Sequence, residues 1–279
     1  MPTSPSIPVR VLALLATLAV TLTACNSVDP APSVPFAERT VQIEPRHYGL
    51  EVDIDTDGRR LRGTATIRLQ NVSDEKADHI PLLLYRLMRV DALRDQSGRP
   101  IDFAQSVEIF EDWDKLQATY VEIRPSAVLD PGEEMTIVVD WSGRLYGYTE
   151  TGMLYVRDTI DADYTLLRPD AYAFPWIGYP HTGVNRSAGL ATFDHEIRVT
   201  VHEPLVAASN GRLAGVERES NRATYRFESI RPSWRMDVAV APFEILDQDG
   251  MRVYFLPGDR PGAVAIQGAF LRAIGTFTE

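Results

Sequence analysis

The chain has 279 residues, enough for one large or two ordinary domains with a sizeable core. Its 28 Lys and Arg residues against 39 Asp and Glu residues give a net charge of −11, which argues against nucleic acid as a partner, because a basic patch is needed to displace counterions. Acidic and basic residues are interspersed without long runs of one sign, so the acidity is typical of a well-hydrated exterior.

The N-terminus has the pattern of an export signal. Arg10 precedes an apolar run over residues 11–22, about half of the ~20 residues that a membrane span requires. Leu22-Thr23-Ala24-Cys25 follows and resembles the bacterial lipobox, in which the cysteine carries lipid. Cys25 is the only cysteine, so neither an internal disulfide nor a thiolate zinc site is expected. An ordinary secretory signal with an incidental cysteine is the alternative.

These features predict a protein exported and anchored to a bacterial cell membrane, on its periplasmic or extracellular face. The expected parts are a signal peptide over residues 1–24, lipid attachment at Cys25 and a flexible tether over 25–40. The tether is rich in Pro, Ser and Ala and has too little apolar content to pack.

The folded part begins near residue 41, and its pattern is that of β strands. Apolar and polar residues alternate over 47–55 and 61–70 on either side of Asp57-Gly58, which predicts a hairpin. Further strands are expected near 80–84, 120–123, 135–139, 193–201, 224–227, 236–240 and 252–255. The strands at 120–123 and 135–139 flank a Pro-Gly turn, so we expect them to pair as a second hairpin. The pattern over residues 86–94 fits strand and helix equally.

Residues 164–180, which we call the crossing, separate two groups of predicted strands. Three prolines exclude a central strand or a continuous helix, and the aromatic residues among them need burial or a partner. We therefore expect an ordered segment that is neither strand nor helix and that forms a wall of a cleft. The alternative is an aromatic plug that closes one end of a sandwich.

The last residues, 259–279, change period. Ile266, Phe270, Ile274 and Phe277 recur at helical spacing, but the sequence stops at Glu279 without a capping signal. We interpret this stretch as a truncated amphipathic helix that leads into a further domain and needs a second surface for its apolar stripe. The expected fold class is thus an all-β domain over residues 41–258 followed by this helix.

Several short segments occur in the order found in one known family. They are His47-Tyr48-Gly49-Leu50, Leu129-Asp130-Pro131-Gly132-Glu133, Gly152-Met153-Leu154-Tyr155, Arg168-Pro169-Asp170-Ala171 and Ala208-Ser209-Asn210-Gly211. In this order and spacing they resemble the N-terminal β domain of the aminopeptidase N family of zinc metallopeptidases. The resemblance implies a saddle-shaped, multi-stranded antiparallel sandwich packed against a helical catalytic domain of the same chain, with a peptide as substrate.

In that family the crossing lines the substrate pocket, so the resemblance makes Leu166, Arg168, Asp170 and Tyr172 candidates for substrate binding. The sequence departs from the family at Leu166 and Arg168, where a Gln and an acidic or amide residue are usual. An arginine in such a wall would favour acidic groups of a substrate through paired hydrogen bonds. The alternative is that Arg168 turns away and pairs with Asp170 or another carboxylate.

The zinc chemistry of the family needs H-E-x-x-H on a helix, and this motif is absent from the sequence. The two His-Glu pairs, at His195 and His202, lie on or beside a predicted strand and on opposite faces of it. We therefore expect no metal ligand and no catalytic residue in this segment, with zinc only in a full-length protein. The first hypothesis is the scaffold and pocket domain of a lipid-anchored aminopeptidase N-like enzyme, and the alternative is a stand-alone lipoprotein module that binds peptides.

Overall fold

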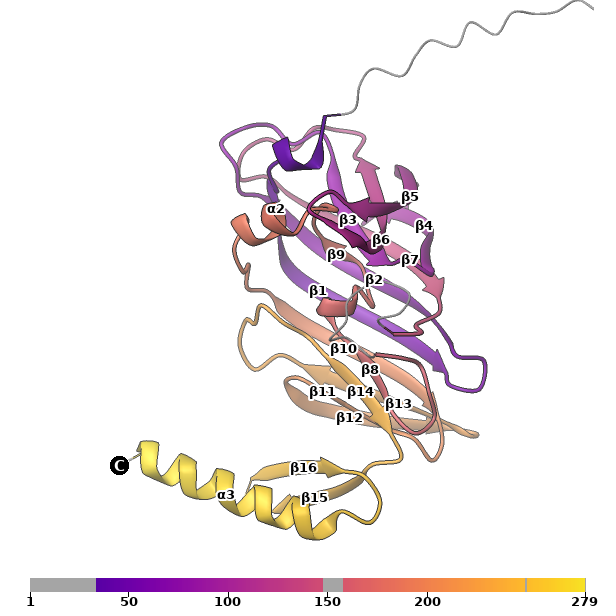
Figure 1. Ribbon diagram of the computed structural model, residues 1–279, viewed down its shortest axis with the longest axis vertical. Helices are drawn as coiled ribbons and strands as arrows, with labels where there is room; N and C mark the ends of the chain where they lie inside the picture. Colours follow the sequence, from indigo (N-terminus) through magenta and orange to yellow (C-terminus); the bar gives the residue numbers. More distant parts are fainter. Residues whose placement is uncertain (1–33, 148–157, 249, 279) are drawn as a thin grey trace, which may run out of the picture. The chain divides into compact units, whose positions relative to one another are not determined.

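A computed structural model describes residues 34–147, 158–248 and 250–278 (Figure 1). The signal peptide, Cys25 and the Gly152-Met153-Leu154-Tyr155 segment lie outside these residues, so the expectations that concern them stay predictions. The described chain consists mainly of β strands in four sheets, which confirms the all-β class. None of its helices combines the length and the hydropathy that a membrane-spanning helix needs.

The largest sheet has the strand order β12-β13-β10-β1-β2-β7-β4. Its strands are β1 (Ile43–Asp55), β2 (Arg60–Asn71), β4 (Met88–Asp95), β7 (Glu134–Gly143), β10 (Asp194–His202), β12 (Arg212–Glu219) and β13 (Arg222–Glu228). The hairpin of β1 and β2 is as predicted, and the ambiguous residues 86–94 fall mostly in β4. The pairings of this sheet are antiparallel, as expected, except that β10 runs parallel to β1. A parallel neighbour needs a long connection, and here that connection contains the second sheet and the crossing.

The second sheet has the order β5-β6-β3-β9 and carries the other half of the main core. Its strands are β3 (Ile80–Tyr85), β5 (Asp102–Phe110), β6 (Trp113–Arg124) and β9 (Trp176–Ile177). Every residue of β3 is buried, as expected for a strand covered on both faces. The apolar residues of both sheets form one cluster, in which Tyr48, Leu82 and Ile137 are fully buried.

The predicted hairpin of residues 120–123 and 135–139 was wrong, because these residues belong to β6 and β7 in different sheets. The loop between them is tied to the end of β2. Asn71 donates its side-chain amide to the carbonyl of Leu129 at 3.0 Å, and Gly132 donates its N–H to the carbonyl of Asn71 at 2.9 Å. These bonds turn the chain away from β6 and into the large sheet.

The remaining elements form two smaller units and short helices. A three-stranded sheet has the order β11-β14-β8, from β8 (Thr165–Leu167), β11 (Val206–Ser209) and β14 (Val238–Ala241). The hairpin of β15 (Glu244–Gln248) and β16 (Met251–Phe255) packs against α3 (Arg260–Thr278), which confirms the predicted C-terminal helix. The short helices are η1 (Phe36–Glu38), η2 (Pro169–Ala171) and α2 (Thr182–Ser187).

The crossing departs from its prediction as a segment without secondary structure. It contains β8, η2 and β9, but both strands are very short and lie at sheet edges, β8 beside β14 and β9 beside β3. The three prolines lie outside the two strands, so no proline interrupts a ladder. Prolines therefore limit the length of the strands and do not exclude them.

Residues 34–40 were expected to belong to the flexible tether, and this part of the prediction was wrong. The Phe36 ring packs edge-on against Tyr120, with a centroid distance of 5.1 Å. The backbone N–H groups of Phe36 and Ala37 donate to the two carboxylate oxygens of Glu111, each at 2.8 Å. One aromatic side chain and one bidentate carboxylate are enough to attach a segment that is otherwise poor in apolar residues.

We predict that Gly63→Ala destabilises the large sheet by about 2–3 kcal/mol, because overpacking forces neighbours to move. A Cβ at this position would meet the ring of the buried Trp141 and would lie 2.7 Å from the carbonyl oxygen of Glu51. Gly215→Ala in β12 is the matched control, because its added Cβ has no neighbour within 4 Å. Urea unfolding measures both variants, and equal stabilities would contradict the packing described here.

Candidate functional site

An aromatic-lined pocket of about 520 Å³ lies beside the crossing. We call it the aromatic pocket. It is formed by the crossing, the first half of β1, the start of β6 and the segment that follows α2. Six of its lining residues are aromatic: Tyr48, Trp113, Tyr172, Trp176, Phe193 and Trp234. Apolar pockets of this size with a few polar groups are typical of binding sites for small molecules and side chains.

The floor of the aromatic pocket is a cluster of rings that joins the crossing to the large sheet. Tyr48 of β1 stacks on Trp176, with ring planes 12° apart, and packs against Phe193 at 4.9 Å between centroids. The Tyr48 hydroxyl donates to the carbonyl of Pro175 at 3.2 Å, and burial raises the pKa of Tyr48. The floor is therefore held by stacked rings and by one buried hydrogen bond.

One wall of the pocket comes from α2, whose position is fixed by polar contacts. Asp112 accepts hydrogen bonds from the N–H and the hydroxyl of Thr182 and from the N–H of Gly183. Asn185 exchanges hydrogen bonds with the backbone of Tyr179, at 2.9 and 2.8 Å. Burial alone would raise the pKa of the Asp112 carboxyl, but the bonds from Thr182 and Gly183 outweigh burial and lower that pKa.

The structure separates the four candidate residues of the crossing. Asp170 and Tyr172 line the aromatic pocket. Leu166 lies in β8, opposite Ala239 of β14, and is not part of the lining. Arg168 also lies outside the lining, and its Nε is 2.5 Å from a carboxylate oxygen of Asp158. The guanidinium therefore pairs with a neighbouring carboxylate and does not face the pocket, which was the second of the two interpretations of Arg168 from the sequence. Its partner is Asp158 and not Asp170.

A second arginine neutralises Asp170 at the rim of the pocket. Arg235 contacts Asp170 at 2.7 Å and Asp237 at 2.6 Å, and its guanidinium lies over the ring of Trp234. Burial raises the pKa of Asp158, against the opposing effect of Arg168. The carboxylate of Asp170 is thus paired at the rim, whereas Arg186, which also lines the pocket, adds a cationic group beside the rings.

Most lining residues were not among the sequence candidates, and three of them are large apolar residues outside the crossing. Trp113 starts β6, while Leu190 and Trp234 lie in irregular segments after α2 and before β14. Neither periodicity nor a motif marks Leu190 or Trp234. The structure shows that both side chains are exposed. Exposed apolar residues are common on protein surfaces, so a leucine and a tryptophan in loop sequences do not by themselves identify a binding site.

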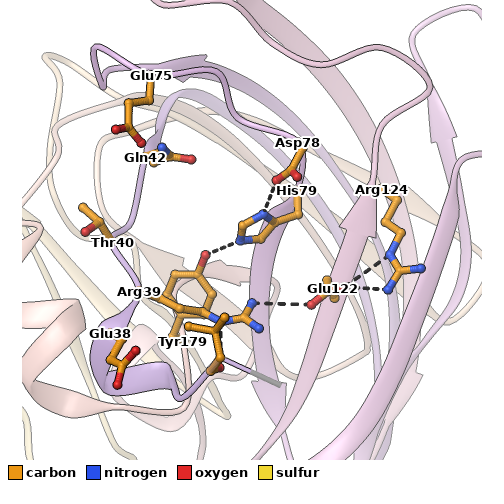
Figure 2. Close-up of a pocket in the computed structure, with 11 residues that line it drawn as sticks. Glu38, Arg39, Thr40, Gln42, Glu75, Asp78, His79, Glu122, Arg124 and Tyr179 are labelled. Carbon is orange, nitrogen blue, oxygen red and sulfur yellow. Dashed lines mark hydrogen bonds and ion pairs between the residues drawn. The ribbon is translucent and has the colours of Figure 1, made fainter. Parts of the chain in front are cut away.

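A second pocket of about 570 Å³, which we call the polar pocket, lies beside η1 (Figure 2). His79 contacts Asp78 through Nδ1 at 2.7 Å and the Tyr179 hydroxyl through Nε2 at 2.5 Å. Glu122 pairs with both Arg39 and Arg124, at 3.5 and 2.9 Å. Burial raises the pKa of Tyr179 to about 12, so its hydroxyl stays protonated. These polar groups satisfy one another, and the aromatic pocket is therefore the better candidate site.

The lining of the aromatic pocket is suited to binding an apolar group. Within residues 34–147, 158–248 and 250–278, no group of three or more His, Cys, Asp or Glu side chains could hold a metal ion. His195 is buried in the core, as expected, and burial lowers its pKa. The described residues therefore do not supply the donor set of a zinc peptidase.

The chain matches no protein-family model and no curated protein. Its fold is similar to that of an M1 zinc metallopeptidase from Deinococcus radiodurans, with a TM-score of 0.56 and 19% identity. A mutant of that enzyme bound to a Tyr-Ser-Ala substrate gives a TM-score of 0.57 at 18% identity. Each comparison covers 76% of this chain and 46% of the metallopeptidase chain. A mutant of a two-domain M1 zinc metallopeptidase bound to L-tryptophan gives a TM-score of 0.56 at 19% identity. That comparison covers 76% of this chain and 47% of the metallopeptidase chain.

These similarities establish a shared fold, and the present chain spans less than half the length of the similar structures.

We predict that Asp112→Ala destabilises the protein by about 1 kcal/mol at neutral pH, as for the loss of a helix cap. The partial exposure of the carboxylate keeps the value low. Because the pKa of Asp112 is lowered on folding, its contribution is complete above the unfolded pKa of about 4 and disappears as the pH falls through the lower folded value. Urea unfolding of both proteins from pH 7 to pH 3 tests this, and a stability difference that stays constant over the range would contradict it.

Proposed function

We propose that this chain is the N-terminal, substrate-facing part of a lipid-anchored zinc metallopeptidase of the M1 type, and that its aromatic pocket binds an apolar side chain of a peptide. The observation that carries the proposal is an aromatic pocket built around the crossing, on a fold shared with peptide-cleaving enzymes. Zinc and the catalytic residues belong to a following domain, and the lipid is attached at Cys25.

The pocket suits an apolar side chain for physical reasons. The rings of Tyr48 and Phe193 are buried and support Trp176. An apolar side chain would lie against the partly exposed rings of Trp113, Tyr172 and Trp176, where its burial contributes about 1.5–3 kcal/mol. Its lining also includes Arg186, whose guanidinium can donate hydrogen bonds to a peptide carbonyl. A single pocket of this kind supports weak binding, with a dissociation constant on the order of a millimolar.

A following domain would also explain the surface of α3. Ala263 and Gln267 face the β15–β16 hairpin, and Gln267 donates to the carbonyls of Gln248 and Met251 at 3.2 and 3.0 Å. Ile266 and Phe270 are exposed on the helix. Exposed apolar residues on one face of a helix are typical of an interface. We assign this face to the catalytic domain of the same polypeptide.

The coding sequence after Glu279 separates this function from that of a stand-alone module. The enzyme hypothesis predicts that the reading frame continues into a helical domain with H-E-x-x-H and a further acidic ligand downstream. A stop codon directly after Glu279 would contradict the catalytic part of the proposal. Peptide binding by the pocket does not depend on that result, because it can be measured on the purified chain.

Binding is predicted to depend on the rim residues Leu190 and Trp234. Peptides with an N-terminal Phe and with an N-terminal Gly are titrated into the purified chain while intrinsic fluorescence is recorded, because three of the four tryptophans line the pocket. The Phe peptide should bind about tenfold more tightly, as expected for about 1.4 kcal/mol. Leu190→Ser and Trp234→Ala should each remove most of this preference.

Ile230→Ser is the matched control, because Ile230 is 79% exposed, as Leu190 is 70% exposed, but lies outside the pocket lining. Neither exposed position should change the free energy of unfolding by more than about 0.5 kcal/mol. Equal affinities for the two peptides, or equal losses in Leu190→Ser and Ile230→Ser, would refute peptide binding at the aromatic pocket.

A further inference from the structure

The outer edge of β5 is a candidate interaction surface. Among the strands of the described residues only β6 pairs with β5, so β5, of nine residues, lies at the edge of the second sheet (Figure 1). An edge strand presents backbone N–H and C=O groups that can pair with another strand. Most of β5 is exposed, and its apolar residues Val107 and Ile109 are each 54% exposed.

The other edges of the two large sheets carry features that prevent strand addition. β12 has four charged residues among eight and a bulge between Leu213 and Gly215. β4 has a bulge between Val90 and Ala92, and the Gln105 side chain bonds the N–H and the carbonyl of Val90 at 2.9 and 3.0 Å. β9 has only two residues. Charges, bulges and short length are the usual protections against edge-to-edge pairing.

β5 lacks these protections along most of its length. Its sequence, Asp102 to Phe110, contains no Lys, Arg, Pro or Gly, and its one irregularity lies at the Ile109–Phe110 end, where the chain turns into β6. Apolar residues alternate with polar ones around Val107. Such a segment is a strong template for another β strand.

The residue pattern of β5 is complementary to itself. We propose that β5 pairs antiparallel with β5 of a second copy of this chain, with Ser106 opposite Ser106. In this register Phe103 faces Ile109, Gln105 faces Val107 and Ala104 faces Glu108. All nine residues are paired and no like charges face each other. The two four-stranded sheets become one continuous sheet through a two-fold axis, the commonest symmetry of homodimers.

Neighbouring registers are less favourable. In an antiparallel pair, residues that lie opposite each other point to the same face of the sheet. The two-fold axis must therefore pass through a residue position of β5 and cannot lie between two residues, so the nearest alternatives are centred on Gln105 and on Val107. Centring it on Gln105 places Asp102 opposite Glu108, two like charges, and centring it on Val107 leaves Asp102 and Phe103 without partners in the opposite strand. Both shifts also shorten the overlap. The Ser106 register is therefore the one that the sequence of β5 specifies.

Cysteine crosslinking tests this register in the full 279-residue chain, purified in mild detergent. The Ser106→Cys protein should form a disulfide-linked dimer on mild oxidation, because opposite Cβ atoms lie about 5 Å apart. Ala104→Cys should crosslink at least about tenfold less, because its two copies would be offset by four residues, about 13 Å. A mixture of Ala104→Cys and Glu108→Cys proteins should again crosslink. The unchanged chain controls for any contribution of Cys25.

Light scattering on the unmodified chain gives the second readout. We expect a dimer with a dissociation constant on the order of 10–100 µM, which Val107→Lys weakens at least tenfold without changing the free energy of unfolding. A monomer at all concentrations up to about 500 µM overturns the proposal. So do equal crosslinking yields for Ser106→Cys and Ala104→Cys, or a dimer that Val107→Lys leaves intact, because the contact would then lie elsewhere.

Discussion

The burial of Tyr48 beneath the crossing is the contact on which the candidate site depends. Its ring stacks on Trp176 and packs against Phe193, and its hydroxyl donates to the carbonyl of Pro175. A buried aromatic ring of this size contributes several kcal/mol, and its hydroxyl needs a partner once water is excluded. One side chain of β1 thus connects the large sheet with the crossing and forms the floor of the aromatic pocket.

The ion pairs near the crossing determine which groups of the aromatic pocket are available to a ligand. Arg168 is paired with Asp158, and Arg235 is paired with Asp170 and Asp237, whereas Arg186 lines the pocket itself. What they leave open is a surface of rings with a few polar groups at the rim. A scaffold of this kind can select a side chain, while the activation of water is left to another domain, which is the division of labour that we propose for the full-length protein.

The sequence predicted those parts of the structure whose signal is local. Alternation identified β1, β2 and β10 because each has one face in the core, and helical spacing identified α3. The pairing of β1 with β2 was predictable because its turn is local. The partners of β6 and β7 were not, because the bonds of Asn71 that send these strands to different sheets join residues far apart in sequence. Asp170 and Tyr172 of the crossing do line the pocket, whereas Leu190 and Trp234 lie in segments without periodicity. The pairing of Arg168 with Asp158 was also not predictable, because the two residues lie on either side of β8 and meet only once the chain has folded.

The most direct test of the central claim is to locate a bound peptide. A short peptide with a photoreactive leucine analogue at its N-terminus is irradiated with the protein, and the labelled residues are identified by mass spectrometry. We predict labels in the segments that line the aromatic pocket, around Trp113, Leu190 and Trp234, and we expect an excess of the Phe peptide to remove them. Competed labels confined to the polar pocket or to the surface of α3 would contradict it.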